Sequence, residues 1–298
     1  MIKLIQKVIV SNFKCIKEQI LEDITPIVGI VGRNGSGKSS LLQAIIWVAK
    51  NAGHFNGNGI SLGTKDDIVF GRNSNECTCS VEVILSDGST YKYIISKGGS
   101  VSNEGNKSGI YTEVRYFPPW RHISQRTNRI NELIESDLGT KGPGIHTFIH
   151  YHLHKLFGNI ERGNVDAKEV YQKINNWAEK IGFGKLLDSQ IGHNDVMGTY
   201  RDEIMKLEVP IVDGGFGGNS FLPILLEGYT FRDGVMLIEE PEISLDPAAQ
   251  TEVLEFFIEM ANERNHQIIF TSHSDYIVKK LSEILEMRKS LQIWFPFM

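Results

Sequence analysis

Residues 32–40, GRNGSGKSS, constrain the fold of this 298-residue chain more than any other stretch. They fit the pattern G-x-x-x-x-G-K-[ST], between an apolar run, PIVGIV, and a helical pattern, LLQAII. A strand must therefore end, turn sharply and feed a helix whose first N–H groups face an anion. Glycines let the backbone wrap closely around phosphate, while the lysine and the serine hydroxyl serve the β/γ-phosphates and Mg²⁺. The alternative is a merely glycine-rich turn.

The motif predicts a nucleotide-binding loop with a divalent cation beside it. Lys38 is expected at the phosphates, and Ser39 at the cation. The residues expected to contact the nucleotide are Arg33, Asn34, Gly35, Ser36, Gly37, Lys38, Ser39 and Ser40.

Composition is that of an ordinary globular protein, with 41% hydrophobic and 22% charged residues. The net charge of −5 argues against a strongly basic protein that coats nucleic acid, although the 31 Lys and Arg residues can still cluster in space. No apolar run approaches the ~20 residues of a membrane span, and the start lacks a signal-peptide cleavage region. We therefore expect a cytoplasmic protein that does not enter membranes.

Two of the three cysteines, Cys77 and Cys79, lie close together in ECTCSVEVIL. Half of a metal motif is one interpretation of that spacing. Both, however, share one face of a period-2 pattern with Val81, Val83 and Leu85, which favours small core residues of a strand.

The chain divides by pattern into three parts, with no internal repeat or long coiled coil. Residues 1–117 contain the nucleotide-binding loop and a β-rich region, including a hairpin around Asp87-Gly88. Residues 118–208 show helical periodicity interrupted by glycines and are expected to form a helical insertion. Residues 209–298 return to α/β alternation. The prediction is an α/β P-loop NTPase core with an antiparallel β subdomain and a helical insertion.

A second motif, VMLIEEPEISLDP at residues 235–247, places acids at the end of an apolar strand. In an open α/β sheet, ligands bind at the carboxyl ends of the strands. Phosphoryl transfer to water needs a cation on the β/γ oxygens and a carboxylate that orients the water. Glu239 suits the cation, through bound water, and Glu240 suits the general base. The alternative is a solvated acidic turn.

Two further features follow in the order that such a site needs. Asp246-Pro247 is a typical helix start, an N-cap followed by proline. Next, IIFTSHSDYI delivers His273 to the end of another buried strand. A histidine there can bond the γ-phosphate or the attacking water; a purely structural histidine is the alternative.

This order of motifs resembles the ABC-type (RecF-like) ATPase heads of the RecF, SMC and OLD-like AAA family group, over nearly the whole chain. VSNFKCIKEQILEDITPIVGIVGRNGSGKSSLLQAI is similar to that group's entry strands and Walker A loop, VMLIEEPEISLDP to its Walker B and D-loop, and TSHSDYIV to its switch-histidine segment. The resemblance implies that Glu240 is the catalytic carboxylate, acting with Lys38 and His273. It also implies that residues 244–246 are the D-loop, with Asp246 near the nucleotide.

A fourth element, VDGGFGGNSFLPILLEGY at residues 212–229, resembles the glycine-rich signature of this group. There, the signature of one subunit contacts the γ-phosphate held by the other. Exposed glycine N–H groups at a helix start form an anion cradle, for which Gly217, Asn219 and Ser220 are the candidates. The usual serine is missing in register, so a flexible loop stays an alternative. Glu239 also stands where aspartate is commoner, and no Q-loop glutamine is evident.

Two residue clusters have weaker interpretations. His146, His150 and His154 recur at helical spacing with His152 nearby, but the run lacks a Cys or acid, which favours a polar stripe over a zinc site. A cluster of arginines around Trp120 is either a solvated face or a patch that contacts nucleic acid. Its members are Arg115, Arg121, Arg126 and Arg129.

The combined prediction is a head that binds and hydrolyses ATP with Mg²⁺ and forms a homodimer around the nucleotide. Because the chain carries no nuclease motif and no arm, we expect it to switch a separate effector, such as a nuclease, that acts on DNA or RNA. The resemblance implies genome maintenance or defence against phage and plasmids. Two alternatives stay open: the nucleotide-binding subunit of a membrane transporter, and a scaffold that binds ATP without hydrolysing it.

Overall fold

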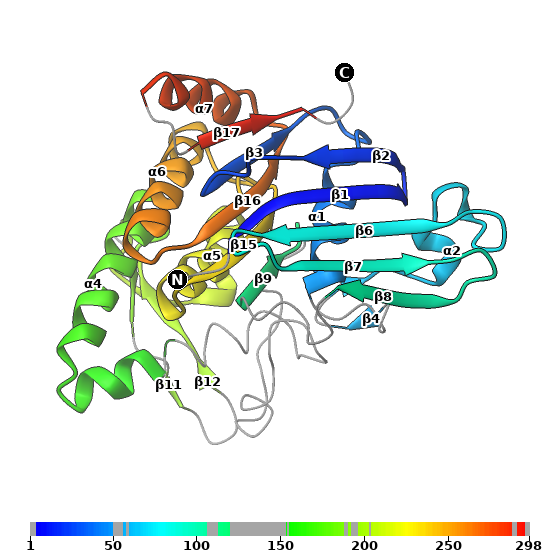
Figure 1. Cartoon of the computed structure of the whole chain (residues 1–298). Helices are drawn as coiled ribbons and strands as arrows, with labels where there is room; N and C mark the ends of the chain where they lie inside the picture. The colour runs from blue at the N-terminus through cyan, green and yellow to red at the C-terminus, as the bar shows by residue number, and fades with distance from the viewer. Residues whose placement is uncertain are drawn as a thin grey trace. The chain divides into compact units, whose positions relative to one another are not determined.

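Figure 1 shows the computed structural model of the chain. The chain divides into two compact units. Unit 1 comprises Met1–Pro118, Asp233–Glu240 and Ala261–Met298, and unit 2 comprises Pro119–Arg232 and Pro241–Met260. The structure describes the chain except for residues 1–3, 50–55, 58–59, 106–112, 120–152, 154, 188–189, 192–195, 203, 288–290 and 296–298. The histidine run at residues 146–154, Trp120 and all of the arginine cluster except Arg115 therefore lie outside the described residues.

A five-stranded parallel sheet forms the centre of unit 1, in the order β17-β3-β16-β15-β9. These strands are Leu291–Trp294, Ile27–Val31, Gln267–Ser272, Gly234–Glu239 and Glu113–Phe117. Every residue of β3, β15 and β16 is buried, as the continuous apolar runs predict for strands covered on both faces. The register pairs Val31 with Ser272 and Glu239 with Thr271, so the carboxyl ends of these strands lie at one edge.

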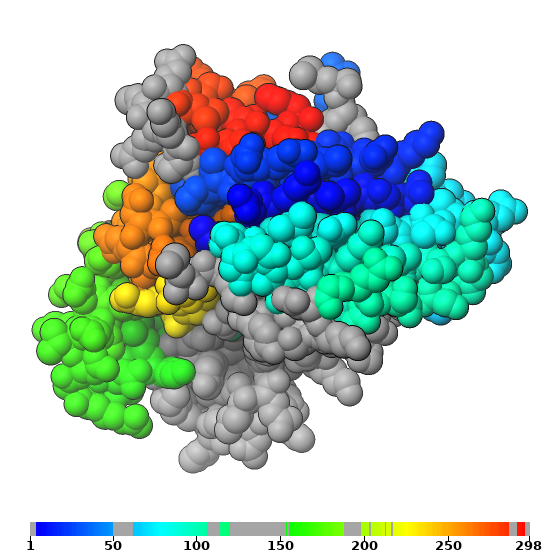
Figure 2. Space-filling model, viewed as in Figure 1, coloured from blue at the N-terminus to red at the C-terminus, as the bar shows by residue number. Residues whose placement is uncertain are grey.

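Unit 1 also contains an antiparallel sheet in the order β2-β1-β6-β7-β8. Its strands are Ile16–Leu21, Ile5–Phe13, Cys79–Leu85, Thr90–Ile95 and Val101–Gly105. Burial alternates strictly along β6, with Cys79 inside, which confirms the hairpin and the core role predicted for this cysteine. The face of this sheet opposite to Cys79 forms a broad surface in Figure 2, coloured blue to blue-green. The Gln267 side chain joins the two sheets, since its Oε1 accepts from Ile5 N and its Nε2 donates to Ile5 O, both at 2.8 Å.

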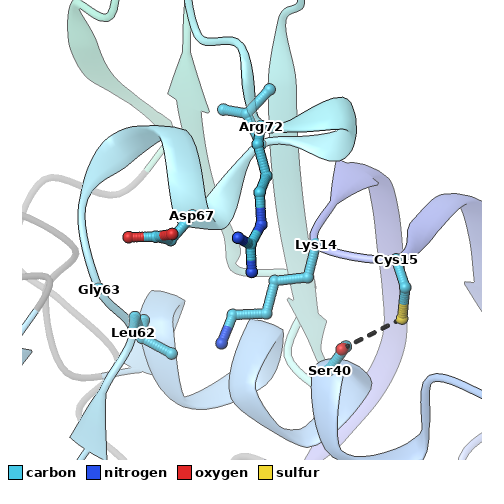
Figure 3. A pocket seen from close by; sticks show the side chains of 8 residues that line it. Lys14, Cys15, Ser40, Leu62, Gly63, Asp67 and Arg72 are labelled. Carbon is cyan, nitrogen blue, oxygen red and sulfur yellow. Dashed lines mark hydrogen bonds between the residues drawn. The ribbon is translucent and has the colours of Figure 1, made fainter. Parts of the chain in front are cut away.

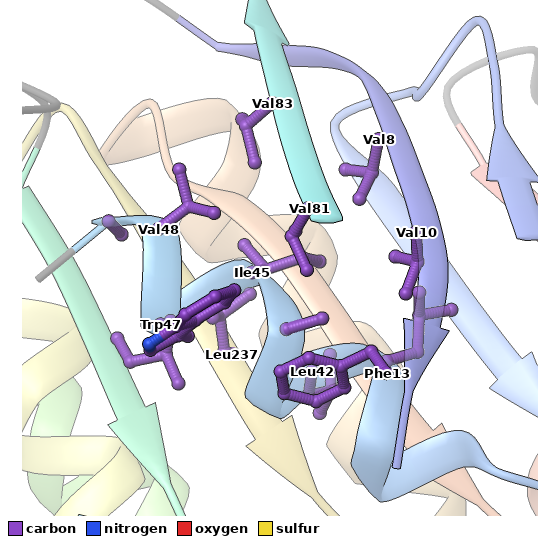
Figure 4. Packing of buried hydrophobic residues seen from close by; sticks show 14 of the residues in the cluster. Val8, Val10, Phe13, Leu42, Ile45, Trp47, Val48, Val81, Val83 and Leu237 are labelled. Atoms are coloured by element: carbon purple, nitrogen blue, oxygen red, sulfur yellow. The ribbon is translucent and has the colours of Figure 1, made fainter. Parts of the chain in front are cut away.

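Helix α1, Lys38–Ala49, lies in the core between these sheets (Figure 4). Leu42, Ile45 and Trp47 of α1 pack among valines of β1 and β6 and against Leu237 of β15. Apolar side chains surround the helix, as its sequence requires for a helix buried on several faces. Burial of each such side chain contributes about 1.5–3 kcal/mol, so the core holds the start of α1 in place at the sheet edge.

The other elements of unit 1 are short or peripheral. They are α7 Asp275–Met287, α2 Lys65–Ile68, the 3₁₀ helix Phe70–Arg72, β4 Asn56–Gly57 and β5 Ile60–Ser61. Within the described residues, no helix combines the length and apolarity needed to cross a membrane.

The helices of unit 2 include α4 Val165–Lys180, α5 Phe216–Thr230 and α6, which runs over Pro247–Glu263 and ends in unit 1. Phe256 of α6 contacts the rings of Trp177, Phe221 and Tyr229. Glu259 accepts hydrogen bonds from Trp177 Nε1, at 3.1 Å, and from the Tyr229 hydroxyl. These contacts tie α4 and α5 to α6.

Residues 118–208 are not only helical. Besides helices, their described part contains four short strands, β10 Lys185–Leu186, β11 Gln190–Ile191, β12 Val196–Met197 and β13 Thr199–Arg201, and the start of a fifth, β14 Glu208–Pro210. Strands of two or three residues show no alternation long enough to detect, so the sequence pattern missed them. A 3₁₀ helix, Ile211–Asp213, leads from β14 towards α5.

Candidate functional site

The loop of residues 32–37 joins β3 to α1 and has the backbone of an anion cradle. Gly35 and Gly37 adopt φ of 79° and 90°, values that residues with a Cβ rarely adopt. Ser36 N donates to Arg33 O at 3.2 Å, and Leu41 N donates to Gly37 O at 3.0 Å, so α1 starts directly after the last glycine. The predicted strand, loop and helix are thus all present.

Lys38 occupies the interior of this loop. Its side chain is buried, and Nζ donates to Gly32 O at 2.7 Å and to Arg33 O at 3.0 Å. The buried Ser36 hydroxyl has no hydrogen-bond partner within the described structure, and such a group normally finds one. Arg33, Asn34, Gly35 and Ser39 are exposed. An ammonium, an orphaned hydroxyl and a glycine cradle together fit a phosphate group.

Glu239, the last residue of β15, is buried, with 3% of its surface exposed. The Tyr116 hydroxyl of the neighbouring strand β9 donates to Glu239 Oε1. Sequence reasoning missed Tyr116, because its contact with Glu239 depends on β9 lying beside β15 in the sheet. Ser39 and Glu239 offer hard oxygen donors of the kind that Mg²⁺ prefers, so the predicted donor set fits this ion.

Glu240 and His273 lie together at the edge where β15 and β16 end. His273 Nδ1 is 3.3 Å from Glu240 Oε1. Glu240 has a left-handed backbone, with φ of 46°, and its N–H lies 3.0 Å from Thr271 O and 3.2 Å from Thr271 Oγ1. The carboxylate that contacts the histidine is thus carried by an uncommon backbone conformation, held by two acceptors on Thr271.

Strand order brings these parts to one edge. β16 lies between β3, which carries the loop, and β15, which carries both glutamates. Neighbouring strands are about 4.8 Å apart, so the loop and Glu240 start from strands about 10 Å apart. Lys38, Glu239, Glu240 and His273 all belong to unit 1.

The glycine-rich segment and the D-loop candidate belong to unit 2. Asn219 and Ser220 are buried, with Asn219 Nδ2 donating to Gly214 O at 3.0 Å and Ser220 Oγ lying 2.9 Å from Ile243 O. Both side chains point into the unit, whereas the sequence predicted nucleotide contacts for them. Asp246 caps α6, since its Oδ1 accepts from Ala248 N at 2.9 Å and Ala249 N at 3.1 Å, as predicted for a helix start.

A pocket of about 500 Å³ in unit 1 opens beside Ser40 (Figure 3). Lys14 and Arg72 point into it, and Cys15 Sγ lies 3.3 Å from Ser40 Oγ. Burial lowers the pKa of Lys14, an effect that the nearby negative charge of Glu239 opposes. Sequence reasoning singled out neither Lys14 nor Arg72, because only the fold brings these two side chains to the same pocket.

Comparison with known proteins supports the same interpretation. A family model described as an AAA ATPase domain matches residues 4–104 and 84–278. An OLD nuclease of Thermus scotoductus is 24% identical, with 91% of this chain and 59% of that protein covered. The chain thus spans about six-tenths of the length of this relative.

Two solved structures share the fold. An SMC head bound to the C-winged helix domain of ScpA has a TM-score of 0.59 and 15% identity, covering 93% of this chain and 91% of the other. The recombination mediator protein RecF has a TM-score of 0.51 and 14% identity, covering 92% and 93%. The predicted P-loop fold and the resemblance to RecF, SMC and OLD-like heads are confirmed.

Proposed function

This chain belongs to the family described as the AAA ATPase domain, and we propose that it binds ATP with Mg²⁺, hydrolyses it, and dimerises around the nucleotide. The observation that carries the proposal is that the segments bearing four side chains follow neighbouring strands at one edge of the parallel sheet. Lys38 follows β3, Glu239 and Glu240 end β15, and His273 follows β16.

Each residue has a distinct role in this proposal. The loop N–H groups and Lys38 bind the phosphates, and Lys38 exchanges its bonds to loop carbonyls for bonds to phosphate oxygens. Glu240 orients the attacking water and accepts its proton. His273, at 3.3 Å from Glu240, holds that carboxylate and contacts the phosphate end. Mg²⁺ would neutralise charge on the β/γ oxygens, with Ser39 and Glu239 as its protein donors.

The dimer supplies the second face of the site. The start of α5 presents glycine-rich backbone and a helix N-terminus, which suit an anion held by another subunit. Residues 244–246 form the D-loop in this proposal, and Asp246 within it approaches the same nucleotide. Binding closes the two copies and hydrolysis separates them.

The output passes to an effector that acts on DNA or RNA. Support comes from the relatives: one is an OLD nuclease longer than this chain, and an SMC head was solved with part of another protein, ScpA. A nuclease that associates with this head is the effector that we propose, in genome maintenance or defence against foreign DNA.

Lys38→Ala tests the nucleotide site. The change removes charged hydrogen bonds worth about 1.5–3 kcal/mol, so affinity for ATP is expected to fall on the order of 10- to 100-fold. Lys279→Ala, on the exposed face of α7, is the control. Unchanged nucleotide binding by Lys38→Ala would remove the site assignment.

Glu240→Gln tests hydrolysis and the dimer together. Without the general base, turnover is expected to fall about 10²- to 10⁴-fold, while ATP stays bound and the dimer accumulates in size-exclusion chromatography. Glu283→Gln on α7 is the matched control for loss of an exposed charge. If Glu240→Gln neither retains ATP nor shifts towards dimer, the switch model fails. Turnover at the wild-type rate would instead favour another base.

A further inference from the structure

Contacts inside unit 2 fix the loop of residues 242–246 to the first turn of α5. Ser220 Oγ lies 2.8 Å from Gly217 O and 2.9 Å from Ile243 O. Both neighbours are carbonyls, so the hydroxyl is the donor. Only 1% of Ser220 is exposed, so the hydroxyl is not available to a ligand in this conformation. It joins the helix to the loop.

Gly217 strengthens the same junction by having no side chain. A Cβ at Gly217 would lie 2.2 Å from Ser244 O and 2.9 Å from Ser244 C. These are backbone atoms, which cannot rotate away as a flexible side chain can. Ser244 itself has a left-handed backbone, with φ of 60°, an uncommon conformation that needs support from its surroundings.

Helix α6 holds the other side of the loop. Gln250 Nε2 donates to Leu245 O at 2.9 Å, and Leu245 N donates to Glu242 O at 3.0 Å. Asp246 caps the first turn of α6. The loop is therefore held between two helix starts, with α5 contributing Gly217 and Ser220.

We propose that Gly217 and Ser220 are positioning residues that hold the loop of residues 242–246 and the start of α5 as one rigid piece. This inference rests on the proposed function, in which both segments meet a nucleotide in the partner subunit. Held together, they arrive at that nucleotide in a fixed relative position. Ser220 thus acts through the loop and not as a phosphate ligand.

The first measurement needs neither nucleotide nor dimer. Hydrogen exchange of the amides at 242–246 is compared for the wild type, Gly217→Ala and Ser220→Ala. Both variants are expected to exchange faster there, with the rest of unit 2 unchanged. Gly158→Ala is the control, because Gly158 lies in a helical turn of unit 2 where a Cβ meets no heavy atom within 4 Å.

The second measurement separates positioning from binding or folding. Because the nucleotide loop belongs to unit 1, Gly217→Ala and Ser220→Ala are expected to keep the wild-type affinity of the monomer for ATP. Turnover by the dimer is expected to fall about 10- to 100-fold, the cost of misplacing a reacting group by roughly 1 Å. Thermal unfolding of both variants checks that unit 2 is folded.

The outcomes are distinguishable. Faster exchange at 242–246 with wild-type turnover, or unchanged exchange in both variants, overturns the positioning role and leaves the proposed function standing. A wild-type protein that shows neither turnover nor an ATP-dependent dimer overturns both proposals. Faster exchange together with lowered turnover and intact ATP affinity supports the inference.

Discussion

At the scale of single residues, the Tyr116–Glu239 hydrogen bond links the two strands that frame the acidic end of the site. Both side chains are buried, at 7% and 3% exposure, and the hydroxyl donates to the carboxylate, which favours one orientation of Glu239. A buried hydrogen bond to a charged group contributes about 1.5–3 kcal/mol. Tyr116 is therefore a positioning residue for Glu239.

Tyr116→Phe should raise the Mg²⁺ concentration needed for half-maximal ATP turnover about tenfold, because Glu239 loses the donor that orients it. Binding of ATP without Mg²⁺ should stay unchanged. Tyr91→Phe is the matched control, because the buried Tyr91 hydroxyl has no hydrogen-bond partner in the described structure. A Mg²⁺ titration of each variant checks this. Identical titrations for Tyr116→Phe and wild type would contradict the orienting role.

The cysteines differ in accessibility. Burial raises the pKa of Cys79 to about 12, so its thiolate, the reactive form, is scarce at pH 8. Cys15 is exposed and lies beside Ser40. Brief iodoacetamide labelling followed by peptide mass spectrometry should modify Cys15 and leave Cys79 untouched until the protein unfolds. ATP should slow the labelling of Cys15. Fast labelling of Cys79 in the folded protein would contradict its place in the core.

At the scale of elements, the short helix α2 depends on carboxylates that cap the backbone. Asp67 Oδ2 accepts from Thr64 N and Thr64 Oγ1, both at 2.8 Å, and Asp66 Oδ1 accepts from Ser74 N at 2.8 Å. Hydrogen bonds from the side chain and then the backbone of Ser74 lower the pKa of Asp66, and those from the backbone and side chain of Thr64 lower the pKa of Asp67, below the ordinary value of 3.8. The segment from Thr64 to Ser74 is therefore acid-sensitive.

Asp67→Asn should destabilise the protein at neutral pH and have less effect in acid. The folded-state pKa of Asp67 is lowered, so its stabilisation is present above 3.8 and is lost as pH falls through the folded-state value below 3.8. Urea midpoints for wild type and Asp67→Asn at neutral pH and at several values below 3.8 check the trend. Asp275→Asn, at the exposed start of α7, is the control. A difference that does not shrink in acid would contradict the capping role.

Elements with long, regular patterns could be predicted from the sequence, and short ones could not. Strands β3, β15 and β16 each contain an apolar run, and the starts of α1 and α6 carry GKS and Asp246-Pro247. The strands at 185–210 have two or three residues each, too few for a period to appear. The length of an element therefore decides whether the sequence pattern can predict it.

The site shows a different limit. The Walker residues follow strands and keep a fixed order, so their convergence follows from parallel topology. Tyr116 meets Glu239 across a separation of 123 residues, and Ser220 meets Ile243 O across 23. Both pairings depend on which elements become neighbours, and no local spacing encodes that.

At the scale of the whole molecule, each unit is assembled from separate stretches of chain. The residues proposed to bind ATP and the residues proposed to contact a second copy belong to different units. The residues proposed to bind ATP and Glu240 belong to unit 1, whereas the start of α5 and residues 241–260 belong to unit 2. Nucleotide binding and dimer closure should therefore leave separate signatures along the chain.

Hydrogen exchange of Glu240→Gln should separate these signatures by protein concentration. At 100 times its dissociation constant, ATP stabilises the state that it binds by about 2.7 kcal/mol, so amides at residues 32–40 should gain protection at every concentration. The first turn of α5 should gain protection only as concentration rises, because mass action governs a contact made by a second copy. Lys38→Ala should lose both effects. If the start of α5 is protected equally in dilute, monomeric protein, the head-to-tail arrangement around ATP is wrong, even if nucleotide binding by residues 32–40 stands.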